Sequence, residues 1–156
     1  MKFRLKPFAI CLAIPLLTGG LAAWITSDAM QTFGTLHQPP LSPPGWLFPV
    51  VWTLLYMVMG LGCYLVWQAR PEPEHKKRTL IWYGVQLLLN FLWPLIFFGL
   101  GWHLPAFFLL LGLLAASLYM TVQFFRLHKA AGLIQIPYLL WLAFAAYLNL
   151  GIYFLN

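Results

Sequence analysis

The sequence predicts an all-α membrane protein, a bundle of five transmembrane helices in a single domain over residues 1–156. Of the 156 residues, 62% are hydrophobic and only 8% are charged, whereas about 25% of residues in a soluble domain are charged. The apolar residues also gather into stretches of about 20, the length that an α-helix needs to cross a bilayer. Composition and stretch length therefore give the same fold class.

Five apolar stretches follow one another along the chain. We expect the first to be a retained membrane span rather than a cleaved signal peptide, because it is long enough to cross a bilayer. The second can begin at Pro44, since the first N–H of a helix has no intrahelical partner and proline lacks that N–H. The expected spans are residues 7–26, 44–68, 79–100, 105–126 and 134–154, with a proline-rich loop over 28–43.

The basic residues predict the orientation. Three of the nine Lys and Arg precede the first span, four lie between the second and third, and two lie between the fourth and fifth. These connections must share one side of the membrane, and the opposite side has none. The positive-inside rule then predicts a cytoplasmic N-terminus, with the loop 28–43, the turn 101–104 and the C-terminus outside.

The spans lack the parts of several function classes. No Asp, Glu, Lys or Arg lies in a span interior, whereas ion-coupled carriers and voltage sensors usually need such groups. The four histidines lie in loops or at helix ends, so no metal site is predicted, and no cofactor is required. Cys11 and Cys63 are expected to be apolar packing residues. The net charge of +6 flanks the spans, which fits contact with lipid and does not suggest nucleic acid.

Three tryptophans lie deeper than the interfacial belt that suits an indole. Trp52, Trp93 and Trp141 are roughly two turns from their helix ends, or about 10 Å at the helical rise. Packing between helices is the alternative for each, and Asn90 and Asn149 could simply be interhelical hydrogen-bonding residues. Each residue nonetheless belongs to a stripe on one helix face: Pro49, Trp52 or Thr53, Tyr56 and Gly60; Gln86, Asn90, Trp93 and Phe97; Tyr138, Trp141, Ala145 and Asn149.

Three such stripes would enclose an aromatic cavity with a few amide and hydroxyl groups, because polar side chains in lipid turn toward the bundle interior. This suits a flat, hydrophobic, mostly uncharged ligand. The stiff prolines of the loop 28–43 would form its lid. The predicted ligand-binding residues are Pro44, Trp52, Tyr56, Asn90, Trp93, Phe97, Tyr138, Trp141, Ala145 and Asn149.

Three stretches resemble those of a known family: PPLSPPGWLFPVVWTLLYMVMG (39–60), LNFLWPLIFFG (89–99) and PYLLWLAFAAYLNLGIYFLN (137–156). The chain is similar over nearly its whole length to the TspO/MBR family, the translocator or tryptophan-rich sensory proteins. The resemblance implies a five-helix bundle, commonly a homodimer. It implies as ligands porphyrins, protoporphyrin IX or heme, and drugs of the isoquinoline and benzodiazepine types. It also assigns Trp52 and Trp141 as catalytic residues if the protein degrades protoporphyrin in the light.

Two departures from the family pattern affect the expectations. Tyr153 is followed by Phe154, Leu155 and Asn156, so the basic residue of the eukaryotic sterol motif is missing and no sterol ligand is expected. We therefore expect a bacterial member in the plasma membrane. Leu41 stands near the place where the family often has a tryptophan, which puts one loop contact in doubt.

Three functions remain open at this point. The first is a tetrapyrrole sensor or carrier that binds porphyrin in the aromatic pocket. The second is light-dependent oxidative degradation of protoporphyrin IX by the deep tryptophans. The third is a structural membrane protein whose aromatic stripes only pack against one another.

Overall fold

The computed structural model describes residues 2–70 and 72–156, which form helices and connections without strands. Five segments are long and apolar enough to cross a membrane, which confirms the predicted all-α bundle. Two short α-helices and one turn of π-helix accompany them. The elements are α1 (Leu5–Ile25), α2 (Ser27–Phe33), α3 (Leu47–Gln68), α4 (Pro73–Pro94), η1 (Leu95–Gly99, the π-helix), α5 (His103–Leu127), α6 (Lys129–Leu133) and α7 (Ile136–Leu155).

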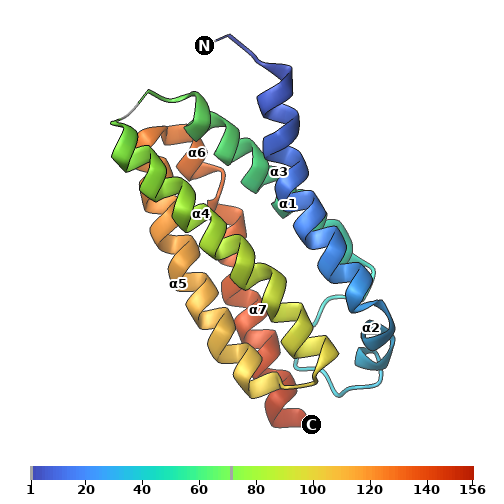
Figure 1. The fold of residues 1–156 in the computed structure, drawn as a ribbon. Helices are drawn as coiled ribbons and strands as arrows, with labels where there is room; N and C mark the ends of the chain where they lie inside the picture. Colours follow the sequence, from blue (N-terminus) through green and yellow to red (C-terminus); the bar gives the residue numbers. More distant parts are fainter. Residues whose placement is uncertain (1, 71) are drawn as a thin grey trace.

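The long helices run side by side along one elongated bundle, with the N- and C-termini at opposite ends (Figure 1). α1 packs on α3, α4 packs on α5, and α5 also packs on α7. The start of α1, the connection between α3 and α4, and α6 lie at the same end of the bundle (Figure 1). All nine Lys and Arg lie in these regions or in the adjoining turns of α4 and α5, so the charge asymmetry is a property of the fold. Which end faces the cytoplasm stays a prediction.

The second span starts later than predicted, because α3 begins at Leu47 rather than at Pro44. The Leu47 N–H donates to the Pro44 carbonyl at 3.0 Å. This hydrogen bond spans three residues, so the chain makes a tight turn over Gly45 and Trp46 before the α-helical pattern begins. Pro44 therefore belongs to the loop.

The loop contains a β-turn that requires an unusual backbone conformation. The Ser42 N–H donates to the Pro39 carbonyl at 3.3 Å, and Leu41 has a φ of 68°. A positive φ at the third residue, after a proline, is the pattern of a type II turn, where glycine is the usual residue. The Leu41 side chain is 84% exposed, so its packing does not explain why a leucine occupies this position.

The third span starts earlier than predicted. α4 begins at Pro73 and not at 79, with proline in its first turn and Glu74 beside it, as helix N-termini favour. The polar residues that we interpreted as a connection are thus largely helical, because polarity marks where lipid ends and not where a helix ends. Residue 71, inside that predicted connection, lies outside the described residues.

The last span begins two residues later than predicted. α6 ends at Leu133, and α7 begins at Ile136 rather than at 134. The fully buried Gln135 at this break donates from Nε2 to the Val58 carbonyl of α3 at 3.2 Å. The predicted turn before this span is therefore the short helix α6, and the predicted loop 28–43 likewise contains most of α2. The first, fourth and fifth spans match their predicted bounds within two residues.

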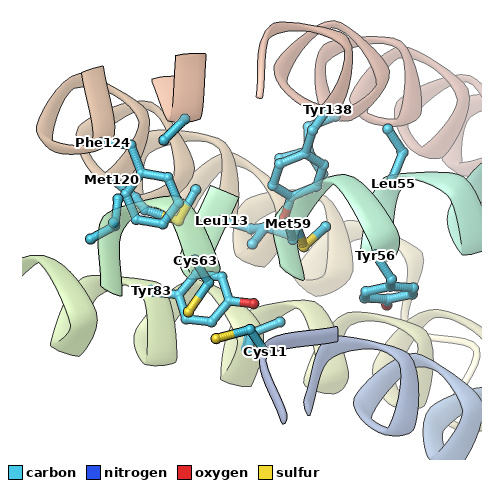
Figure 2. Packing of buried hydrophobic residues seen from close by; sticks show 14 of the residues in the cluster. Cys11, Leu55, Tyr56, Met59, Cys63, Tyr83, Leu113, Met120, Phe124 and Tyr138 are labelled. Carbon is cyan, nitrogen blue, oxygen red and sulfur yellow. The ribbon is translucent and has the colours of Figure 1, made fainter. Parts of the chain in front are cut away.

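A hydrophobic core lies between the helices of the bundle. One cluster of fully buried side chains in it contains Met59 of α3, Leu113 and Phe124 of α5, and Tyr138 of α7 (Figure 2). α1 contributes little to this core, since it buries a smaller share of its residues than the other spans. Its place in the bundle therefore depends on its contact with α3.

We expect Gly60→Ala to weaken the α1–α3 contact. A Cβ on Gly60 would lie 2.6 Å from the Cys11 carbonyl oxygen and 2.8 Å from the Leu12 Cα. Both atoms are backbone, so α1 itself must move, at a cost of about 1–3 kcal/mol. Thermal unfolding in detergent measures the effect. Gly20→Ala is the control, because nothing lies within 4 Å of its Cβ position; equal melting temperatures for both variants would contradict the expectation.

Candidate functional site

A cavity of about 310 Å³ lies between the helices at the end of the bundle where the loop joins α2 to α3. None of its lining residues, all in the described part of the chain, is charged. Its walls are mostly aromatic and small side chains. The lining residues are Gly19, Ala22 and Ala23 of α1; Met30 and Phe33 of α2; Gln38, Ser42 and Gly45 of the loop; Phe48, Pro49, Trp52 and Tyr56 of α3; Asn90, Trp93 and Pro94 of α4; Phe97 and Phe98 of η1; and Trp141, Ala145, Leu148, Asn149 and Ile152 of α7.

The structure brings most of the predicted site residues together in this lining. Eight of the ten predicted residues line it: Trp52, Tyr56, Asn90, Trp93, Phe97, Trp141, Ala145 and Asn149. The other two, Pro44 and Tyr138, do not. Pro44 lies in the loop between two lining residues, Ser42 and Gly45. Whether any of these residues contacts a ligand stays a prediction.

Tyr138 lies behind the cavity because Asn90 separates the two. The Asn90 Nδ2 donates to the Tyr138 hydroxyl at 2.9 Å, and the Tyr138 side chain is fully buried. Helical spacing placed Tyr138 on the correct face of α7. It gave no depth, and Tyr138 is one turn beyond the floor of the cavity.

The floor is a chain of buried hydrogen bonds that links α3, α4 and α7. The Tyr56 hydroxyl donates to Asn90 Oδ1 at 3.0 Å, and the Tyr138 hydroxyl donates to Gln86 Oε1 at 2.7 Å. With the Asn90–Tyr138 bond, these contacts fix the amide orientation and leave the Tyr56 oxygen and one Asn90 N–H free to accept or donate. Asn90 therefore both joins helices and lines the cavity.

A second polar pair forms one wall. The Trp93 Nε1 donates to Asn149 Oδ1 at 3.0 Å, and Asn149 Nδ2 donates to the His103 carbonyl at 2.7 Å. The Trp93 ring stacks on Phe97 with centroids 5.0 Å apart. Since both amide groups of Asn149 are already paired inside the protein, this wall presents mainly ring surface to the cavity.

The π-helix explains how two consecutive phenylalanines reach the cavity. The Leu100 N–H donates to the Leu95 carbonyl at 3.0 Å, five residues back. The wider turn changes the helical register after Pro94, so Phe97 and Phe98 both join the lining. Sequence reasoning found Phe97 from an unbroken helical period and missed Phe98, although Pro94 was a visible signal for an irregular turn. It also missed Phe33 of α2 and Phe48 of α3.

Trp141 carries the one buried indole N–H in the lining without a partner. Its Nε1 has no hydrogen-bond acceptor among the described residues. The ring contacts Phe48 edge-on, with centroids 6.0 Å apart. A buried N–H without a partner costs about 1–3 kcal/mol. The Nε1 atom has almost no exposed surface, so a ligand acceptor can pair with it only after the neighbouring rings shift.

The loop is fastened over the cavity by three hydrogen bonds and one packing contact with the second half of α7 and Asn156. The His37 N–H donates to Asn156 Oδ1 at 3.0 Å, and Asn156 Nδ2 donates back to the His37 carbonyl at 2.8 Å. The Tyr147 hydroxyl donates to the Pro40 carbonyl at 2.7 Å. Pro39 packs directly against Gly151, where a Cβ would lie 2.6 Å from the proline ring. No sequence pattern predicts these contacts, because they join residues more than a hundred positions apart.

Metal ligands do not gather here. Within residues 2–70 and 72–156, no group of three or more His, Cys, Asp or Glu side chains could hold a metal ion. The chemistry that the site offers is therefore aromatic stacking and neutral hydrogen bonding.

A bundle of five membrane-spanning helices around an uncharged aromatic cavity defines an integral membrane protein with room for a small ligand. Comparison with known proteins gives the same class, since a model of the TspO/MBR family matches residues 11–155. The chain belongs to the TspO/MBR family, as its motifs predicted.

The relatives come from distant organisms at similar identity. The "Tryptophan-rich protein TspO" of Archaeoglobus fulgidus is 35% identical over 97% of both chains. The human "Translocator protein" is 37% identical over 81% of this chain and 75% of its own length. "Protein CrtK" of Rhodobacter capsulatus is 37% identical over 80% of this chain and 78% of its own length. Identity alone thus does not separate bacterial relatives from mammalian ones.

We expect Tyr138→Phe to destabilise the fold. It leaves Gln86 Oε1 and Asn90 Nδ2 buried without their partner, at a cost of about 1–3 kcal/mol. Tyr153→Phe is the matched control, because Tyr153 is 41% exposed. Thermal unfolding of both variants in the same detergent checks the difference, and an unchanged melting temperature for Tyr138→Phe would argue against the hydrogen-bonded floor.

We expect Asn156→Ala to loosen the loop, because the change removes both hydrogen bonds to the His37 backbone. The amide of His37 should exchange faster with deuterium, and limited proteolysis should cut residues 34–46 sooner. Asn156→Asp keeps the acceptor and loses the donor, so its effect should be intermediate. Equal exchange rates in all three proteins would mean that the loop is held by other contacts.

Proposed function

We propose that the protein binds porphyrins such as protoporphyrin IX or heme in the aromatic cavity and acts as a tetrapyrrole sensor or carrier. The unpartnered Trp141 N–H carries this proposal, because it lies among aromatic rings in an uncharged cavity. A flat conjugated ring with hydrogen-bond acceptors matches both features. The cavity volume is at the lower end of the range for small-molecule sites, so a porphyrin would need the loop to move.

The negative charge of the porphyrin carboxylates suggests how the ligand is oriented in the cavity. Porphyrin carboxylates are costly to bury without a partner, and the apolar walls offer none. The loop contributes the polar side chains Gln38 and Ser42, and it borders the end of the bundle. The ring would therefore enter first, with its carboxylates toward the loop and water.

Sensing or passive carriage fits better than driven transport. The span interiors contain no Asp, Glu, Lys or Arg, so the chain has no group for coupling uphill transport to ions. A relative in Cereibacter sphaeroides is named "Tryptophan-rich sensory protein", and that name supports a sensing role here.

Light-dependent oxidative degradation of protoporphyrin IX is the second candidate. Trp52 and Trp141 face the same cavity from α3 and α7. Indoles are electron-rich and easily oxidised, so both could react with a photo-excited porphyrin and oxygen. This chemistry requires no acid–base machinery.

The remaining assignments accompany this proposal. The protein would lie in a bacterial plasma membrane with its N-terminus in the cytoplasm, where the basic end of the bundle meets anionic lipid. It would be a homodimer. Its cavity would also accept hydrophobic drugs of the isoquinoline and benzodiazepine types. A sterol ligand does not fit, since no basic residue follows Tyr153.

Titration of protoporphyrin IX into the purified protein in lipid nanodiscs tests binding. We expect saturable quenching of tryptophan fluorescence. Trp141→Phe removes the free N–H and should weaken binding by about five- to tenfold, the value of one hydrogen bond. Ala145→Phe should abolish binding, because Ala145 lines the cavity, whereas Leu140→Phe on the exposed side of α7 (68% exposed) should not change it.

Illumination of the same samples separates the two functions. Binding without a new absorbance band supports a sensor or carrier. A new chromophore that is lost in Trp52→Phe or Trp141→Phe supports degradation. Absence of saturable binding would overturn both and leave a structural protein whose aromatic residues only pack.

A further inference from the structure

Two cysteines lie next to each other in the membrane-spanning part, away from the cavity lining. Cys11 of α1 and Cys63 of α3 are both free thiols, 8% and 7% exposed. Their thiols are neighbours across the contact between the two helices (Figure 2). Packing alone was the expectation from sequence, because both residues lie inside apolar stretches.

Gly60 explains why these thiols meet. Its missing side chain lets the α1 backbone approach α3 so closely that the Cys11 carbonyl oxygen lies 2.6 Å from the Cβ position. Cys63 is three residues further along α3, on the same face of the helix. The closest point of the α1–α3 crossing is therefore also where Cys11 and Cys63 come together.

A third reactive group completes the cluster. The Tyr83 hydroxyl of α4 is buried and has no hydrogen-bond partner among the described residues. The Tyr83 ring lies beside Cys63 (Figure 2), and its hydroxyl interacts with the Cys63 thiol without the geometry of a hydrogen bond. A hydroxyl left unpaired in an apolar interior is costly, and no contact in the core explains why a tyrosine and not a phenylalanine occupies this position.

We propose that Cys11 and Cys63 are an oxidation site, at which singlet oxygen dissolved in the bilayer converts the two thiols into an intramolecular disulfide. The Tyr83 hydroxyl is placed to donate a hydrogen bond to the oxygen adduct. Peroxides suit this site poorly, because they react with thiolates and an apolar interior disfavours the charged form. Singlet oxygen is uncharged, dissolves in hydrocarbon, and adds to the lone pair of a neutral thiol.

The chemistry balances in two steps. Oxygen adds to one sulfur, and the thiol proton moves to the terminal oxygen to give Cys–S–O–OH. The second thiol sulfur attacks this sulfur, the S–O bond breaks, and the leaving hydroperoxide takes the second thiol proton as hydrogen peroxide. Two thiols lose two electrons in total, and one oxygen molecule gains them.

The disulfide would make the α1–α3 crossing covalent. Both helices also form a wall of the cavity, where Gly19 of α1 faces the Tyr56 ring of α3 so closely that the ring leaves no room for a Cβ. Oxidation would therefore fix the position of that wall. The proposal needs no porphyrin, since any sensitiser in the bilayer supplies the oxidant.

The test uses the full chain in nanodiscs of saturated lipid, with phenalenone as an apolar sensitiser that is not a tetrapyrrole. We expect illumination in air to remove both free thiols and to give a Cys11–Cys63 cross-linked peptide by mass spectrometry, with no change in an oxygen-free sample. Cys11→Ser and Cys63→Ser should each form no internal disulfide, and the remaining sulfur should be oxygenated instead.

Tyr83→Phe tests the hydroxyl. It should slow disulfide formation severalfold at equal illumination, while Tyr119→Phe, on a different helix, should react like the wild type. An unchanged rate in Tyr83→Phe would overturn the role of Tyr83. Wild-type thiols that stay free, that are oxygenated without an S–S bond, or that cross-link only between chains would overturn the proposal itself. None of these outcomes depends on porphyrin binding, so the two proposals fail separately.

Discussion

The pairing of the Asn90 amide organises the interior of this bundle. An amide in an apolar medium is costly unless its donors and acceptors are paired, and Asn90 meets that requirement with one tyrosine from α3 and another from α7. These bonds fix three helices relative to one another at a single depth. On one side of this level the helices pack into a core, and on the other they separate around a cavity.

Most polar groups in the cavity walls are likewise paired within the protein, which leaves the site mainly aromatic and uncharged. Trp93 and Asn149 satisfy each other and the His103 carbonyl, and the loop is held by the amide of Asn156. Most polar groups near the cavity are thus already used by the fold. What remains for a ligand is ring surface, the N–H of Trp141, the Tyr56 oxygen and one N–H of Asn90. A preorganised site of this kind selects for shape and for a few neutral hydrogen bonds rather than for charge.

Sequence reasoning predicted the fold class, the five spans and most of the cavity lining, because lipid imposes a strong pattern on helices that cross it. Stripes of aromatic and amide residues gave the correct faces of α3, α4 and α7. Depth and irregular backbone could not be predicted in this way. Tyr138 lies behind Asn90, Phe98 enters the cavity through a π-helical turn, and Pro44 belongs to a turn rather than to α3. The loop contacts of Tyr147 and Asn156 depend on the fold of the whole chain.

Small residues on α1 and α3 allow the two helices to approach each other both at the cavity and at the Cys11–Cys63 pair. Gly19 makes room for the Tyr56 ring at the cavity, and Gly60 makes room for the α1 backbone beside the thiols. Because α1 has few other buried contacts, its position is set at these two points. A covalent bond at one point restricts motion at the other, since a helix transmits displacement along its axis. The Cys11–Cys63 pair therefore lies where an oxidised state would fix the position of α1, a part of the cavity wall that the Asn90 hydrogen bonds do not hold directly.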